Sequence, residues 1–195
     1  MKKLILSGLL AIGTLLTAQA QNINFGIKGG LNVAKMTNYD NKAIANFNAG
    51  GFVNVGLTKD WAIQPELIYS GQGADVNWNV AGITFMKGTL NTSYINIPVM
   101  VQYSIVPSFF VEAGPQIGFL LSAKIKNGST KSDIKDRMTT ADFGLGLGCG
   151  FKITDNFGVN ARYVFGLSNV YNNNSILVNA ESKNSVAQFG LFYQF

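Results

Sequence analysis

Histidine is absent from this chain of 195 residues, and cysteine occurs once, at Cys149. A single cysteine cannot form an internal disulfide, and without imidazole there can be no zinc or copper site built on histidine. Cys149 has no nucleophile-activating histidine and is expected to be a small apolar residue. We therefore expect no catalytic residue, no metal site and no cofactor.

Charge is also scarce. Charged residues make up 13% of the chain, about half of the usual fraction in a soluble domain. The formal net charge is +5, but no segment gathers the Lys and Arg that would follow a phosphate backbone. Nucleic acid is excluded as a partner by this pattern.

Long apolar runs are missing, except at the N-terminus. Lys2 and Lys3 precede an apolar run from Leu4 to Leu16, and Ala18-Gln19-Ala20 supplies small residues for cleavage. This pattern predicts a secretory leader over residues 1–20, removed after Ala20. No later stretch approaches the roughly 18 apolar residues that a membrane-spanning helix needs. We expect residues 21–195 to form one domain.

What the chain has in abundance is alternation of apolar and small or polar residues, typical of strands. In each alternating segment the apolar residues fall on odd numbers. The segments are 25–33, 47–57, 61–69, 95–105, 109–121, 141–153, 157–167 and 185–195. The last segment must pair with the first to close the sheet. The sequence thus predicts an all-β fold, an eight-stranded antiparallel up-and-down transmembrane β-barrel.

The connections between these segments alternate between short and long. Short turns are expected at residues 58–60, 106–108 and 154–156, and long polar loops at residues 34–46, 71–90, 122–138 and 168–184. Short turns at one rim and long loops at the other are typical of outer-membrane barrels, with the short turns in the periplasm.

A soluble lipocalin-like barrel also alternates, with its apolar face inside. The even-numbered face decides between the two because it carries mostly Gly, Asn, Gln, Thr and Ser, as in Gly144, Gly146, Gly148 and Gly150. A surface in water normally carries interspersed Lys and Glu, whereas small polar side chains fit the crowded lumen of a narrow barrel. We therefore expect the odd face in lipid. Glycine at period two, with no helix following, also argues against a phosphate-binding loop.

The inward face carries a few charges, including Lys28, Glu66, Glu112 and Arg162. Glu66 and Arg162 each lie five residues beyond the start of a strand at the short-turn rim, at Trp61 and Phe157. We predict that these two form a salt bridge in the lumen, with Glu112 and Lys28 nearby. The network is interpreted as a structural plug, and a gate or an ion path is the alternative.

Aromatic residues follow the short turns, and Trp61, Phe109 and Phe157 are predicted to form a periplasmic aromatic girdle. The terminal residue, Phe195, is predicted to serve as a recognition end for barrel insertion. Three prolines lie within expected strands, and each is predicted to mark a bulge because proline removes a ladder donor. They are Pro65, Pro98 and Pro115.

Three stretches, Gln64–Gly73, Tyr94–Tyr103 and Ala113–Lys124, resemble the PorT-like family of outer-membrane β-barrel proteins. The resemblance covers essentially the whole mature chain and includes all three prolines. It implies an eight-stranded barrel in the Gram-negative outer membrane, and one namesake is tied to protein secretion. The shared motifs are structural and carry no catalytic residues.

The expected function is a structural or surface-interaction role through the four long loops. The alternatives are a narrow porin-like channel, which would conduct, and a component of protein secretion, which would bind periplasmic or membrane partners. An enzyme is not expected, since barrel enzymes of the outer membrane use a histidine base. Expected partners are outer-membrane lipid, the barrel-assembly machinery during biogenesis, and an extracellular ligand or protein; we expect a monomer.

Overall fold

The computed structural model describes residues 23–36, 43–80, 83–127, 130–169 and 183–195. The predicted leader, residues 1–20, lies outside this part of the chain, as do most of the expected loop 168–184 and residues 37–42 of loop 34–46. In the described part, no helix is long and apolar enough to cross a membrane.

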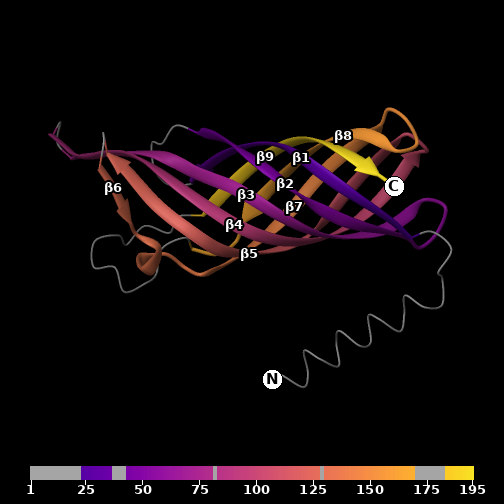
Figure 1. Cartoon of the computed structure of the whole chain (residues 1–195), viewed down its shortest axis with the longest axis horizontal. Helices are drawn as coiled ribbons and strands as arrows, with labels where there is room; N and C mark the ends of the chain where they lie inside the picture. The colour runs from indigo at the N-terminus through magenta and orange to yellow at the C-terminus, as the bar shows by residue number, and fades with distance from the viewer. Residues whose placement is uncertain (1–22, 37–42, 81–82, 128–129, 170–182) are drawn as a thin grey trace, which may run out of the picture.

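Antiparallel strands make up nearly all of the structure (Figure 1). They are β1 (Ile23–Met36), β2 (Ile44–Gly56), β3 (Trp61–Val80), β4 (Ile83–Val106), β5 (Phe109–Asn127), β6 (Thr130–Asp133), β7 (Ala141–Lys152), β8 (Phe157–Gly166) and β9 (Asn184–Gln194). A 3₁₀ turn, η2 (Lys135–Arg137), lies between β6 and β7. Eight of these strands form the wall, and β6 pairs only with β5.

The sheet closes on itself. Each wall strand pairs with the next, and the terminal strand β9 pairs with β1 from Gly26↔Gln194 to Met36↔Asn184. The pairing of β4 with β5 joins the two ends of the remaining sheet. The predicted eight-stranded antiparallel barrel is therefore confirmed, including its closure by the first and last strands.

The two faces of the wall follow residue parity. Large apolar side chains that are exposed on the outside are odd-numbered, apart from Val106 beside a turn. Even-numbered positions point inward, where Glu66, Gln102, Glu112 and Arg162 are buried. The register shift at Ser93/Tyr94 reverses this parity in β5 beyond Leu121, so that Ala123 is buried and Lys124 is exposed. An apolar outside around a polar inside is the reverse of a soluble barrel and the arrangement of a barrel in lipid.

The short-turn rim is built by similar chemistry at two of its turns. The Thr58 hydroxyl oxygen accepts a hydrogen bond from the Trp61 backbone N–H at 3.1 Å, and Thr154 does the same for Phe157 at 3.0 Å. Such threonine turns satisfy backbone donors where the ladder ends. The C-terminus lies at this same rim (Figure 1), where the Phe195 backbone N–H bonds to Phe25 O at 2.8 Å.

The predicted loop at residues 71–90 is wrong, because most of it is strand. β3 continues to Val80 and β4 begins at Ile83, with a register shift between Trp78 and Asn79. β5 likewise continues to Asn127 and turns back as β6. The polar composition that suggested a loop is compatible with a strand where both faces of an antiparallel sheet can meet water. At the end opposite to the short turns, where outer-membrane barrels carry their extracellular loops, these strands reach beyond the others (Figure 1). We call residues 75–80, 83–89, 122–127 and 130–133 the extracellular extension.

The predicted bulges at the three prolines are also wrong. The β3–β4 register is unchanged on either side of Pro65 and Pro98, from Gln64↔Met100 to Ile68↔Asn96. The pairs on the two sides of Pro115 likewise keep one register between β5 and β7. The shifts within these ladders lie elsewhere, at Trp78/Asn79, Ser93/Tyr94 and Ser104/Val106. Each proline removes one donor, but the neighbouring pairs hold the strands in register.

Candidate functional site

Four charged side chains from four strands meet in the lumen. Arg162 of β8 donates to both carboxylate oxygens of Glu66 on β3, at 2.8 and 2.7 Å. Its Nε donates to Glu112 Oε1 on β5 at 2.7 Å, and Lys28 Nζ of β1 lies 3.2 Å from Glu66 Oε1. The structure thus brings together all four charges that the sequence predicted for the lumen, with Glu66 and Arg162 in direct contact.

A glycine makes the contact between Arg162 and Glu112 geometrically possible. Gly148 of β7 pairs with Glu112 on one side and with Arg162 on the other. A Cβ on Gly148 would lie 2.9 Å from Glu112 Oε1 and 2.7 Å from the backbone oxygen of Ala161. The absence of a side chain on the strand between them therefore leaves the space through which the guanidinium reaches the carboxylate.

Amide side chains surround the ion pairs. Gln64 donates to Glu66 Oε1 at 2.8 Å, and Gln102 donates to Glu112 Oε2 at 3.0 Å. Asn54 donates to both glutamine oxygens, at 3.0 and 2.8 Å. Each carboxylate thus accepts from a charged donor and from an amide, as buried ionic groups require.

The burial of this network decides what it can do. The side chains of Glu66, Glu112 and Arg162 are 0%, 2% and 2% exposed, and that of Lys28 is 8% exposed. The two formal positive charges balance the two negative ones. Groups that are buried, paired and neutral as a set form a crosslink between four strands and block the lumen at this level.

Below the network, toward the short turns, three phenylalanines point inward. Phe52, Phe110 and Phe192 pack together, with ring centroids 6.4 Å apart for Phe52–Phe192 and 6.1 Å for Phe110–Phe192. Each ring is directly cross-strand from a glycine, in the pairs Gly26↔Phe52, Phe110↔Gly150 and Gly158↔Phe192. A ring that covers a cross-strand glycine fills the space left by the missing side chain.

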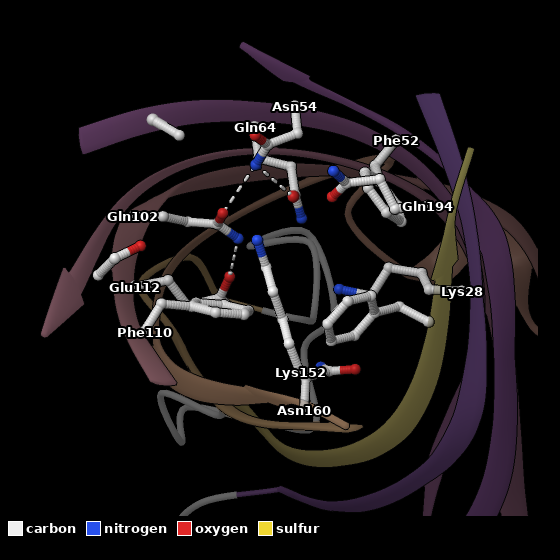
Figure 2. Close-up of a pocket in the computed structure, with 13 residues that line it drawn as sticks. Lys28, Phe52, Asn54, Gln64, Gln102, Phe110, Glu112, Lys152, Asn160 and Gln194 are labelled. Carbon is white, nitrogen blue, oxygen red and sulfur yellow. Dashed lines mark hydrogen bonds between the residues drawn. The ribbon is translucent and has the colours of Figure 1, made fainter. Parts of the chain in front are cut away.

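A small cavity is lined by the three phenylalanines and by Lys28 and Glu112 of the network (Figure 2). Its volume is about 50 Å³, and Lys152 of β7 extends into it beside Gln64 and Gln102. A polar cavity of this size holds a few water molecules. It is far too small for a continuous aqueous pore.

Above the network, amides and hydroxyls fill the lumen. Asn32 donates to Ser70 Oγ and to Gly71 O, both at 2.8 Å. Asn48 and Gln188 donate to the oxygen of Asn32. Further out, Gln72 donates to Ser70 at 2.9 Å and accepts from Asn184. The lumen is thus filled by paired side chains above the ion pairs as well.

At the extracellular end, the inner face of β3, β4 and β5 is apolar and covered. Ala74, Leu90, Tyr94, Leu120 and Ala123 form a buried cluster with Met138, which follows η2, and Ile134 packs against it. The Ile134 backbone N–H bonds to Ala123 O at 3.0 Å. The connection from β5 to β7 is thereby fixed against the inside of the wall.

The predicted girdle residues lie at the short-turn rim. Trp61, Phe109 and Phe157 are the first residues of β3, β5 and β8. Trp61 is 47% exposed, and its ring is 4.8 Å from that of Tyr103. Phe195 is exposed beside Tyr193. Their roles in the interface and in insertion stay predictions.

Two features of the lumen were missed from the sequence. The phenylalanine cluster had a signal, because Phe52, Phe110 and Phe192 are the even-numbered phenylalanines in otherwise odd-apolar strands. For the amide network, the only signal in the sequence was the high frequency of Asn and Gln at even-numbered positions. No group of three or more His, Cys, Asp or Glu residues that could hold a metal ion occurs in the described ranges.

Residues 18–172 match the family described as "Outer membrane protein beta-barrel domain". The chain belongs to this family. It is an outer membrane β-barrel protein of the Gram-negative type, in agreement with its closed wall and apolar outer face. No curated protein sequence matches the chain.

Solved structures show the same fold for this family member. Neisserial surface protein A matches with a TM-score of 0.58 and 12% identity, over 90% of this chain and 100% of that one. Ail, the attachment invasion locus protein of Yersinia pestis, in complex with the heparin analogue sucrose octasulfate, matches with a TM-score of 0.50 and 16% identity, over 89% and 97%.

Proposed function

We propose that this outer membrane barrel has a surface-interaction role, exercised through its extracellular side, and that the lumen network is a structural plug. The observation that carries the proposal is the contrast between the two parts of the molecule. The lumen is filled by paired side chains, whereas β3, β4 and β5 continue beyond the wall as the extracellular extension. A filled barrel offers its outer end, and not its interior, to partners.

The names of two fold neighbours agree with this proposal. One is called a surface protein and the other an attachment invasion locus protein. At 12% and 16% identity they share the fold with this chain, so the proposal rests on its own geometry.

A shortened variant tests the proposal. Ala74 and Leu90 are cross-strand partners, so an Asn-Gly turn between them would remove residues 75–89 and close the hairpin at the wall. Cells displaying the full barrel are expected to bind at least one of a set of purified matrix proteins and glycans coated on a surface. Cells displaying the shortened barrel are expected to fall to the level of cells without the protein.

Two controls make this experiment decisive. A heat-modifiable shift on gels shows that the shortened barrel still folds, and the Lys59→Gln variant alters a short turn at the opposite rim. Equal binding by the full and shortened barrels, or no binding by either, would contradict a role for the extension in surface contacts.

A narrow channel is the second candidate, supported by the charged side chains that line the lumen. Glu66→Gln distinguishes the plug from the gate because it removes one charge from the centre of the network with little change in shape. The plug predicts an unchanged current in planar bilayers, since amides and phenylalanines still fill the lumen. A gate predicts a larger single-channel conductance in the variant.

A role in protein secretion is the third candidate and rests on the resemblance to the PorT-like family. Co-purification with periplasmic or membrane partners would distinguish it from the surface role. We further propose that the protein is a monomer without catalytic activity, inserted by the barrel-assembly machinery with Phe195 as the recognition end after removal of residues 1–20. The absence of histidine and the ion pairing of both lumen glutamates support a non-catalytic role.

A further inference from the structure

The outward face of the β5–β6 hairpin carries three exposed lysines. Lys124 and Lys126 lie on β5, two residues apart and therefore on one face, and Lys131 lies on β6 directly opposite Lys126. The intervening residues of β5 point the other way, since Ala123 is fully buried and Ile125 packs against the inner apolar cluster. The three ammonium groups thus share one side of the sheet.

No ion pair neutralises these lysines within the described ranges. Lys126 and Lys131 are like charges at directly opposed positions, an arrangement that destabilises a sheet. Asp133 lies opposite Lys124, but its carboxylate accepts the Lys135 backbone N–H at 2.9 Å and forms no salt bridge with Lys124.

A second carboxylate, that of Asp75, also accepts a hydrogen bond. Asp75 lies in the same cross-strand row as Lys126, with Thr89 between them. Its carboxylate accepts the Thr89 hydroxyl at 2.7 Å. Lys126 and Lys131 are therefore adjacent positive charges, and neither of them forms an ion pair with Asp75 or Asp133.

The position of the β5–β6 hairpin relative to the lipid indicates which anionic groups lie close to the three lysines. The outward apolar residues of β5 end at Leu121, which is 46% exposed. A tilted strand advances about 2.5 Å per residue along the barrel axis, so Lys124 and Lys126 lie roughly 8 and 13 Å beyond the end of this apolar band. The headgroup layer is about 5–8 Å thick, and lysine side chains can bend back toward it.

We propose that Lys124, Lys126 and Lys131 form a binding site for the phosphate groups of an outer-leaflet lipid, of the kind carried on the disaccharide headgroup of lipopolysaccharide. The site continues the lipid-facing surface of the barrel upward into the headgroup layer. A phosphate between Lys126 and Lys131 would relieve their repulsion and supply the missing counter-charge. The same chemistry would attract a soluble polyanion, so the experiment must separate the two sources.

The test uses the full, immobilised barrel in detergent micelles mixed with diphosphoryl lipid A, with retained lipid A measured by mass spectrometry after washing in the same detergent. We expect Lys126→Gln/Lys131→Gln to reduce the affinity for diphosphoryl lipid A by about tenfold or more at low salt. Binding by the unaltered barrel should weaken as salt is raised. Monophosphoryl lipid A should be retained less well than the diphosphoryl form.

Matched control variants distinguish an effect of this site from an effect of the protein's net charge. Lys35→Gln/Lys59→Gln also removes two exposed positive charges, one at the outer end of β1 and one in a short turn, and should reduce retention much less. Lys126→Arg/Lys131→Arg should restore retention. Binding to heparin resin serves as the probe for a soluble polyanion. Equal losses of lipid A retention in the two glutamine double variants, or a loss of heparin binding in Lys126→Gln/Lys131→Gln without loss of lipid A retention, would overturn the proposal. A heat-modifiable gel shift establishes that each variant is folded.

Discussion

Arg162→Met is expected to lower the free energy of unfolding by about 3–5 kcal/mol, the typical loss when one partner of a buried ion pair is removed. The variant leaves Glu66 and Glu112 charged, with side chains 0% and 2% exposed, and Lys28 compensates only part of that charge. Urea unfolding of the barrel in phospholipid vesicles, followed by the fluorescence of its two tryptophans and by the gel shift, measures the change.

A neutral combination serves as its control. Lys28→Met/Glu66→Gln/Glu112→Gln/Arg162→Met removes every charge of the network while keeping similar side-chain volumes. Its stability should lie much closer to that of the unaltered protein, because no unpaired charge stays buried. If Arg162→Met alone costs less than about 1 kcal/mol, the network is solvated and the lumen is wetter than described.

Leu147→Arg is the second large effect, and it tests the environment of the outer face. Leu147 is 47% exposed and lies near the middle of β7, between Ala113 and Tyr163. A surface substitution in water usually changes stability by less than about 0.5 kcal/mol, whereas arginine at the bilayer midplane costs about 2–4 kcal/mol. The measurement is again urea unfolding in vesicles.

Val106→Arg is its matched control. Val106 is 49% exposed, close to the exposure of Leu147, but it lies beside a short turn opposite Phe109, where an arginine costs only about 0–1 kcal/mol because it reaches the interface. Equal and small effects at Leu147 and Val106 would place the odd-numbered face in water and contradict a transmembrane barrel.

The barrel was predictable because its environment imposes one rule on every wall strand. Lipid requires apolar side chains outside, so residues such as Leu147 and Phe165 fall on one parity, and the closing pair of β1 and β9 follows from the count of turns. The contact between Glu66 and Arg162 was also predictable. Charges on the inward face are few, and these two lie at equal distances from the short turns.

The extracellular extension was not predictable because the rule no longer applies beyond the lipid. Outward-facing residues of the extension can be polar, as in the cross-strand pair of Asp75 and Thr89, whose side chains are hydrogen-bonded to each other. The alternation of apolar and polar residues therefore disappears there, although the backbone pairing continues. The proline errors have a related cause. A missing donor at Pro65 or Pro115 is a local loss, and the many neighbouring ladder pairs fix the register. The stabilisation of the register by many neighbouring pairs cannot be predicted from the chemistry of the proline alone.

The closed lumen and the extracellular extension together distinguish this protein, as a plugged barrel with a surface role, from a pore. In the plugged barrel, the Arg162 ion pairs, the amides around Asn32 and the phenylalanines around Phe192 close successive levels of the same lumen. Conductance of the unaltered, folded protein in planar lipid bilayers tests this closure most directly. The account predicts no stable single-channel steps across a range of voltages. Reproducible steps from protein that shows the heat-modifiable shift would contradict it.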